Sequence, residues 1–126
     1  MNPATLAKPT VTMGSAVRSG PALMQRRRER GISRGLFTEM TDFSLRKLAT
    51  YEKTRRLPKK VVRPITTALR LLNALSELAG DETALKTWIK TPNTAFDDHT
   101  PLALIKAGKA DQLWEMIHQV RQGAFA

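Results

Sequence analysis

Cationic and hydroxyl side chains between residues 44 and 56 carry the clearest chemistry in this sequence. Arginine can make paired hydrogen bonds to guanine and threonine can reach a base edge, whereas lysine more often neutralises a phosphate. The pattern therefore predicts a surface that contacts double-stranded DNA. Seven residues make up this predicted DNA-binding set: Ser44, Arg46, Lys47, Thr50, Lys53, Arg55 and Arg56. Lys59, Lys60 and Arg63 follow at once and are expected to lie along the DNA backbone.

The charge of the chain is divided sharply between its two halves. Residues 1–64 hold 15 Lys and Arg against 4 Asp and Glu, a net charge of +11, whereas residues 65–126 hold 6 against 7, a net charge of −1. The first half suits a polyanion and the second half suits a protein partner. Binding to DNA through about six phosphate contacts would weaken with salt, with a log–log slope of about −5.

Two short helices are predicted to position the cationic residues. Ser33 and Ser44 are candidate N-caps, and each is followed by apolar residues at helical spacing. Two helices joined so closely, with the second apolar on one side and basic on the other, are typical of a helix-turn-helix. A generic helix pair is the alternative. The residues expected in the core of this pair are Phe37, Met40, Phe43, Leu48 and Tyr51.

The string SRGLFTEMTDFSLRKLATYEKTRRLP resembles the helix-turn-helix of Xre-type repressors. In this resemblance Ser44-Leu45-Arg46 starts the recognition helix, and Tyr51-Glu52 stands where those proteins often carry Trp-Glu. Asp42 and Thr54 replace glycines of the usual pattern. Aspartate tolerates left-handed backbone geometry, whereas a β-branched residue does not, so the exit from the second helix is expected to differ.

The residues before this pair are predicted to form an arm and one helix. Residues 1–20 are expected to be a flexible basic arm, because prolines and glycines interrupt any helix there. A solvated tail without DNA contact and a mitochondrial transit peptide are the alternatives for this composition. Residues 22–30 can form a short helix ended by Gly31. The basic run at residues 26–30 is read equally as a phosphate contact or a solvated face.

The strongest helix pattern runs from Pro64 to Gly80. Its apolar residues cover more than half of the helix circumference, which is wider than the stripe that one packing partner requires. The second buried side is expected to meet either the C-terminal region or a second copy of the chain. Because paired recognition helices read two half-sites, a homodimer is predicted. Pro58 and Pro64 mark an uncertain entry, with at most a short helical turn between them.

The last third is predicted to be a small helical module. A helix capped by Asp81 or Thr83 runs to about residue 90, and the TPN sequence then reverses the chain. Thr100-Pro101 starts a short helix that ends at Gly108, and a final helix follows over residues 110–122. Trp88 and Trp114 are expected in the core.

The string WIKTPNTAFDDHTPLALIKAG resembles the toxin-binding domain of the Xre/MbcA/ParS antitoxins, over residues 85–125. The resemblance implies an antitoxin of a type II toxin–antitoxin system. Its partner would be a RES-type toxin that consumes NAD, whose active site the C-terminal module occludes, while the Xre-like half represses the operon. The toxin-binding residues that the resemblance implies are Phe96, Pro101, Arg121, Gln122, Gly123 and Phe125. For Phe96, a purely core role is the alternative. The family often has Gly- or Asn-containing turns where this chain has Asp97-Asp98-His99.

Nothing in the sequence predicts catalysis, and the chain is expected not to be an enzyme. It has no cysteine, no glycine-rich phosphate loop and no carboxylate pair with a matching base. No cofactor or metal is expected, because the spacing of His99, His118 and the nearby aspartates matches no ligand pattern. A small nuclease using either histidine and a sequence-independent RNA-binding protein are weaker alternatives. A helix-turn-helix regulator without a toxin partner is the main one.

The sequence therefore predicts an all-α protein in three parts. Residues 1–20 form the basic arm, residues 21–80 an Xre-like DNA-binding and dimerisation domain, and residues 81–126 the toxin-binding domain. The expected partners are operator DNA, a RES-type toxin and a second copy of the chain. No apolar stretch approaches the length of a membrane-spanning helix, so a cytoplasmic location without membrane contact is expected.

Overall fold

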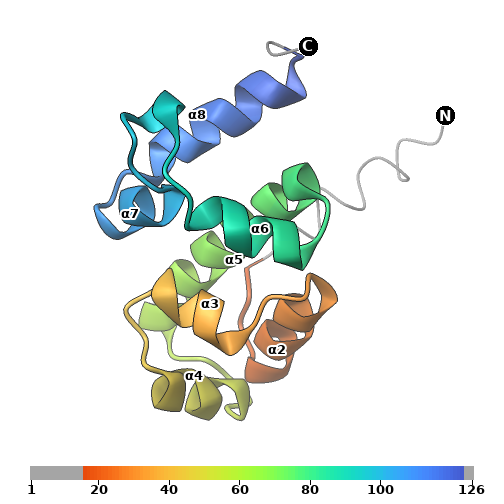
Figure 1. Cartoon of the computed structure of the whole chain (residues 1–126). Coiled ribbons are helices and arrows are strands. Elements are labelled where there is room, and N and C mark those ends of the chain that lie inside the picture. The colour runs from red at the N-terminus through yellow and green to blue at the C-terminus, as the bar shows by residue number, and fades with distance from the viewer. Residues whose placement is uncertain (1–15, 124–126) are drawn as a thin grey trace, which may run out of the picture.

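The computed structural model describes residues 16–123, and within them every regular element is helical, which confirms the all-α prediction (Figure 1). Residues 1–15 of the expected arm, and Phe125, lie outside the described residues. The elements are α2 (Gly20–Glu29), α3 (Arg34–Glu39), α4 (Leu45–Glu52), α5 (Lys59–Ala79), α6 (Glu82–Ile89), the short 3-10 helix η1 (Thr94–Phe96), α7 (Pro101–Lys106) and α8 (Ala110–Arg121).

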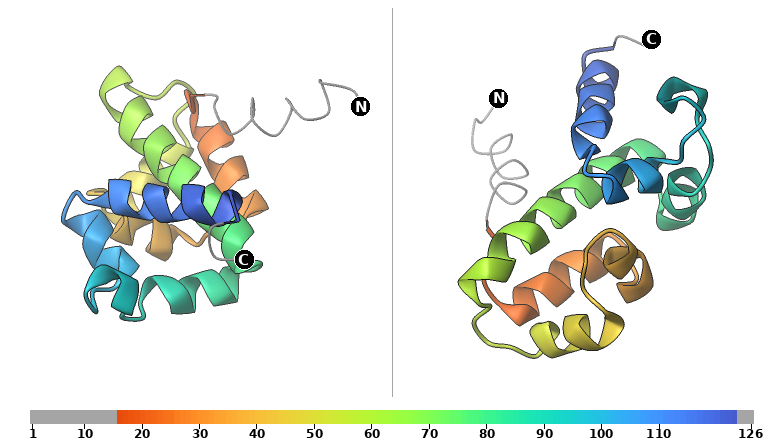
Figure 2. Two further views of the ribbon diagram at one scale, coloured as in Figure 1. Left: turned by 90° about the horizontal axis from the view of Figure 1, so that it is seen from above. Right: turned by 90° about the vertical axis from the view of Figure 1, so that its left-hand side faces the viewer.

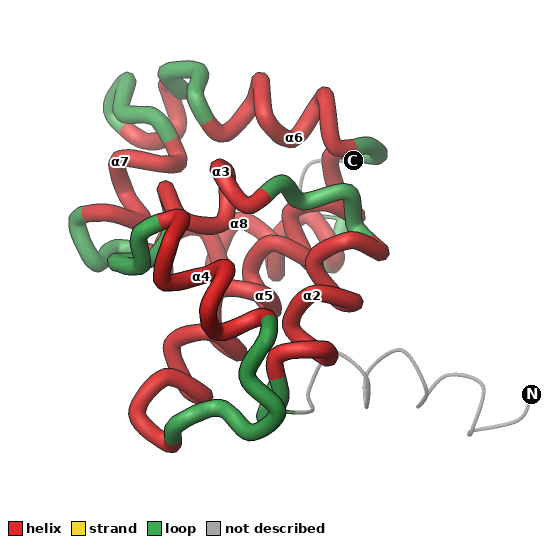
Figure 3. The backbone as a smooth tube through the Cα atoms, turned by 90° about the horizontal axis from the view of Figure 1, so that it is seen from below, coloured by secondary structure: helices red, strands yellow, loops and turns green. Residues whose placement is uncertain are grey.

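The long helix α5 joins the two halves of the molecule. It contacts α2 in the N-terminal half, and it contacts α6 and α8 in the C-terminal half. Figure 2 shows α2 running alongside α5, with α8 across the far part of α5. Seen from below, α4 and the loop that follows it lie at the front of the molecule (Figure 3). The helices α4 and α8 therefore present separate surfaces.

Most of the predicted helix boundaries are confirmed. Ser33, Ser44 and Thr100 cap their helices, each accepting a hydrogen bond from the backbone N–H three residues later. Asp81 caps α6 through the N–H of Ala84. The prediction for α5 was wrong at its start, because the helix begins at Lys59 and runs through Pro64. Proline removes one helical hydrogen bond, but the buried neighbours Val61 and Ile65 hold both sides of it in the core.

The folded region begins before residue 20, so the expected flexible arm is too long. Val17 is fully buried, and its N–H donates to Thr66 Oγ1 at 2.9 Å. The carbonyl of Arg18 accepts a hydrogen bond from the N–H of Leu57 at 2.9 Å. Residues 17–19 thus lie against α5 and the α4–α5 loop, where these backbone groups hold them.

One continuous core spans the two predicted domains. Fully buried side chains extend from α2–α4 along α5 into the C-terminal helices: Leu23, Phe37, Leu48, Ile65, Leu69, Leu72, Leu75, Leu85, Ile89, Leu113 and Ile117. Four of the five predicted core residues of the α3–α4 pair are buried, and Phe43 is half-buried with its ring edge-on to Tyr51 at 5.3 Å between centroids. The wide apolar arc of α5 is largely covered by α6 and α8, so the C-terminal helices supply its second packing partner.

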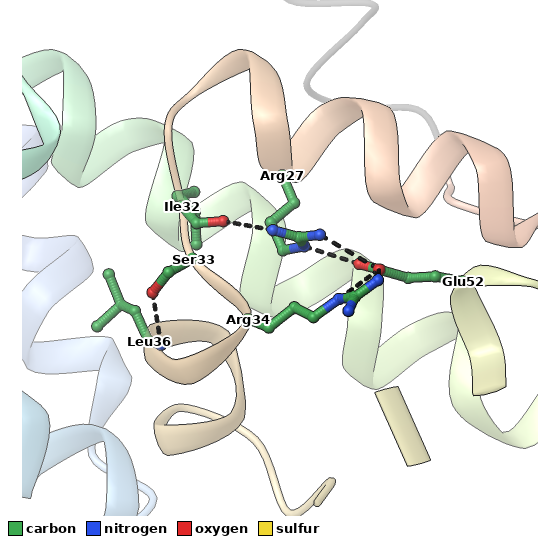
Figure 4. A network of polar contacts seen from close by, with 6 residues as sticks. All are labelled: Arg27, Ile32, Ser33, Arg34, Leu36 and Glu52. Carbon is green, nitrogen blue, oxygen red and sulfur yellow. Dashed lines mark hydrogen bonds and ion pairs between the residues drawn. The ribbon is translucent and has the colours of Figure 1, made fainter. Parts of the chain in front are cut away.

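A buried ion-pair network ties α4 to α2 and α3 (Figure 4). Arg27 Nε donates to Glu52 Oε2 at 2.7 Å, and Arg27 Nη1 donates to the carbonyl of Ile32 at 2.9 Å. Arg34 Nε donates to Glu52 Oε1 at 2.8 Å. Glu52 and Arg27 are only 3% and 6% exposed, so for Arg27 both readings of the basic run, a phosphate contact or a solvated face, were wrong. Leaving either charge unpaired would be costly.

The pKa of Glu52 is set by opposing effects. Burial raises the pKa of Glu52. The hydrogen bonds from Arg27 and Arg34 and their positive charges lower it by more, so the net shift of the pKa is downward from the ordinary value of 4.5. A carboxylate with a lowered folded pKa stabilises the fold fully above about pH 4.5. That stabilisation is lost as the pH falls through the folded pKa.

Replacing Glu52 with glutamine is expected to lower the free energy of unfolding by about 3 kcal/mol at pH 7, because Arg27 is left buried without a counter-charge. The loss should shrink as the pH falls below 4.5. Urea unfolding followed by circular dichroism at pH 7 and pH 4 measures both effects. The control is Glu77→Gln, which removes an exposed carboxylate near Arg30 and Arg121 and should cost about 0.5 kcal/mol or less. Equal losses for the two variants would contradict the account.

Candidate functional site

The predicted DNA-binding residues are all exposed. Ser44, Arg46, Lys47, Thr50 and Lys53 are exposed on α4, and Arg55 and Arg56 are exposed in the loop that follows it. The opposite side of α4 is buried through Leu48, Tyr51 and Glu52. The cations Lys59, Lys60 and Arg63, in the first turns of α5, are exposed as well. Each residue of the predicted set is thus accessible on α4 or beside it.

Local hydrogen bonds decide which groups of α4 are free to meet a ligand. The Ser44 hydroxyl accepts the N–H of Lys47 at 3.0 Å, so its main task is to cap the helix. The Thr50 hydroxyl donates to the carbonyl of Arg46 at 3.1 Å and can still accept one hydrogen bond. Neither Asp42 nor Thr54 has a positive φ, since Asp97 and Asp98 are the non-glycine residues with positive φ among residues 16–123. The exit from α4 therefore avoids the left-handed geometry that a glycine would allow.

The N-terminus of α2 packs against the end of α4 and fixes its position. The N–H of Gly20 donates to the carbonyl of Thr54 at 2.8 Å. A β-carbon at residue 20 would lie 2.6 Å from the carbonyl oxygens of Glu52 and Thr54 and would also clash with that of Tyr51. Only glycine fits so close an approach. Together with Arg27, it sets the direction in which α4 presents its cationic side.

The second surface is an apolar groove at the far end of α5. It has a volume of about 460 Å³ and lies between α5, α6 and α8. Leu78 and Val120 in its wall are 39% and 38% exposed, and Trp88 is half-buried rather than a core residue. The apolar groove, lined by Leu75, Leu78, Ala79, Ala84, Trp88, Met116 and Val120, was missed by the sequence reasoning. The over-wide apolar arc of α5 was the one feature of the sequence that pointed to this groove.

The loop between α6 and α7 buries two of the predicted toxin-binding residues. Phe96 is 8% exposed and belongs to the core, and Pro101 is buried at the start of α7. Both were expected at the contact surface, but their burial means that they hold the loop in place. Asn93 pairs with His99 across the turn, and the left-handed residues are Asp97 and Asp98 rather than Asn93. Glycine and asparagine in related turns suit the same backbone geometry.

The remaining predicted toxin-binding residues lie at the end of α8. The side chain of Arg121 is 41% exposed and its Nη2 lies 3.7 Å from Glu77 Oε2. Gln122 and Gly123 are exposed, and Gly123 has a φ of 76° with its N–H bonded to the carbonyl of Val120. Glycine ends α8 with a left-handed turn there. Gly123 thus lies three residues beyond Val120, which is one of the residues that line the apolar groove.

Residues 16–123 form neither a metal site nor a membrane-spanning helix. No three His, Asp or Glu side chains of residues 16–123 gather as a metal site would require. His99 Nδ1 instead lies 3.0 Å from the carbonyl of Phe96, within its own turn. Among the same residues, no helix combines the length and apolar character needed to cross a bilayer.

The C-terminal part of the chain matches a known protein family. Residues 74–123 match the family described as the antitoxin Xre/MbcA/ParS C-terminal toxin-binding domain. The matched span contains every residue that lines the apolar groove, and it also contains Arg121, Gln122 and Gly123. No curated protein and no solved structure matches the chain. The family match supports an antitoxin role for this chain in a toxin–antitoxin system, with a toxin as its partner.

Proposed function

We propose that this chain neutralises a RES-type, NAD-degrading toxin with its C-terminal module and represses its own operon with α4. The observation that carries the antitoxin part is the match of residues 74–123 to a toxin-binding domain. The operon part rests on the cationic side of α4 and on the resemblance of residues 33–58 to the Xre helix-turn-helix. Such a protein works by binding, as a cytoplasmic regulator without catalysis or a cofactor.

We assign the apolar groove to the toxin. Exposed apolar walls in a small protein mark a surface that a partner covers. All seven lining residues fall inside the span that matches the toxin-binding domain, which favours the toxin over a second copy of this chain. Arg121 stands at the end of α8 beside this groove, and its loose 3.7 Å approach to Glu77 leaves it able to turn to an acidic group of the toxin.

The tail beyond Gly123 is the second element that we assign to the toxin. Its last three residues are Ala124, Phe125 and Ala126, and their sequence offers one large apolar side chain. A toxin that consumes NAD must have a concave pocket for the dinucleotide. A phenylalanine carried by a short tail suits such a pocket and would compete there with NAD.

A homodimer also belongs to the proposal. Because α6 and α8 cover most of the apolar arc of α5, that arc no longer argues for a second copy. The dimer rests instead on the symmetry of operator sites, since two copies of α4 about one DNA turn apart would read two half-sites.

Replacing Val120 with glutamate is expected to weaken toxin binding at least about tenfold, because a charge would be buried in the groove. The matched control is Gln119→Glu, which adds the same charge to an exposed neighbour on α8 and should change the affinity by less than about twofold. Calorimetric titration with the purified RES-type toxin measures both. If Val120→Glu abolishes self-association and leaves toxin affinity intact, the groove joins two copies of this chain and the assignment is wrong.

Deleting residues 123–126 should leave the fold intact and weaken inhibition of the toxin about thirtyfold. This factor corresponds to the free energy of about 2 kcal/mol that burial of one phenylalanine contributes. The single change Phe125→Ala should reproduce most of that loss, whereas Phe125→Leu should retain most of the inhibition. NAD turnover at increasing antitoxin concentration provides the measurement. A truncated chain that inhibits as tightly as the full chain would show that the groove or the α6–α7 loop does the occluding.

The double change of Arg46 and Thr50 to alanine should lower operator affinity at least about tenfold while toxin inhibition stays the same. Lys109→Ala with Thr83→Ala is the control, since both are exposed polar residues of the C-terminal half. Gel-shift titration with the DNA upstream of the gene, together with the NAD turnover assay, separates the two activities. Loss of toxin inhibition in a correctly folded Arg46/Thr50 double variant would contradict the assignment of DNA and toxin to different halves of the chain.

A further inference from the structure

Leu45 is the most exposed large apolar side chain of residues 16–123, at 57%. The other two, Leu78 and Val120, share the apolar groove, but Leu45 stands apart from them as the first residue of α4. Its chain neighbours Ser44, Arg46 and Lys47 are polar and exposed. An isolated exposed leucine is common on protein surfaces, so its meaning depends on the groups that share its side of the helix.

The spacing of residues in α4 places Leu45 beside the two candidate base-reading side chains. Residues at positions i, i+1, i+4 and i+5 occupy one continuous arc of a helix, and here they are Leu45, Arg46, Ala49 and Thr50. Leu48 and Glu52, three and seven residues after Leu45, lie on the neighbouring stripe of the helix and are buried. Glu52 is held by Arg27 at 2.7 Å, so the helix cannot roll to bury Leu45 without breaking that pair. Leu45 therefore extends the exposed Arg46–Thr50 arc at its N-terminal edge.

The chemistry of DNA offers one suitable contact for such a side chain. In the major groove, the edges of adenine, guanine and cytosine present hydrogen-bonding groups, and thymine adds an apolar C5-methyl group. The N-terminal residues of a recognition helix are those that reach base edges. Leucine can neither neutralise a phosphate nor donate a hydrogen bond, so on this surface its favourable partner is a methyl group.

We propose that Leu45 reads sequence by packing on the C5-methyl group of a thymine in the operator. This inference rests on the proposed binding of DNA by α4 and adds a specificity-determining residue to it. Arg46 and Thr50 then supply polar contacts, and Leu45 adds discrimination for thymine over cytosine at the neighbouring base pair. Loss of one methyl contact would weaken binding about fivefold.

The test compares full-length protein on two versions of the duplex upstream of the gene, one with thymine and one with deoxyuridine, which lacks only the methyl group. The wild-type chain is expected to bind the deoxyuridine duplex about fivefold more weakly. Leu45→Ala should bind the thymine duplex with that same loss and should no longer distinguish the two duplexes. Leu45→Met, which keeps an apolar side chain, and the control Gln119→Ala, at an exposed residue of α8, should both retain the discrimination.

The outcomes separate this inference from the proposed function. If the wild-type chain prefers its upstream duplex to unrelated DNA but binds the thymine and deoxyuridine versions equally, the thymine contact is wrong and DNA binding stands. If Leu45→Ala keeps the discrimination and instead loses self-association or toxin inhibition, Leu45 serves a protein contact and the inference is overturned. If the wild-type chain shows no preference for its upstream duplex, the DNA part of the proposed function is wrong as well.

Discussion

The buried pair of Arg27 and Glu52 is the constraint on which the N-terminal half depends. Its two charges come from α2 and from the last turn of α4, and each has lost its water, so each requires the other. Arg34 brings α3 to the same carboxylate, and Gly20 allows the start of α2 to lie against the last carbonyls of α4. The direction of α4 is therefore fixed by directional contacts as well as by apolar packing. A surface that must match a rigid partner benefits from such fixing, because less entropy is lost on binding.

A single helix, α5, connects this half to the C-terminal module. Its buried residues contribute to one core that continues through Leu85 and Ile89 into Leu113 and Ile117. The two halves therefore stabilise each other, although their charges differ by 12 units between residues 1–64 and 65–126. In Figure 1, α4 lies at the bottom of the molecule and α8 lies at the top. Each surface can thus meet its own partner.

The sequence was sufficient where local chemistry decides the structure. Caps at Ser33, Ser44 and Thr100 could be predicted because a hydroxyl needs only a backbone N–H three residues away. Partners distant in sequence could not, so Arg27 was read as a surface residue and its 25-residue separation from Glu52 gave no local signal.

The predicted site residues show the same difference between local and distant effects. The exposed side of α4 could be predicted from helical spacing. Phe96 and Pro101 were expected at a contact surface, but both are buried, which depends on packing that the sequence does not show. The apolar groove needs three helices to form, and the over-wide apolar arc of α5 was the one feature of the sequence that pointed to it.

Hydrogen–deuterium exchange on the full-length chain, alone and bound to the proposed RES-type toxin, tests the central claim most directly. The account predicts slower exchange in α6, in the last turns of α8 and in the tail, with α4 unchanged. Protection of α4 with no change in α8 would contradict it.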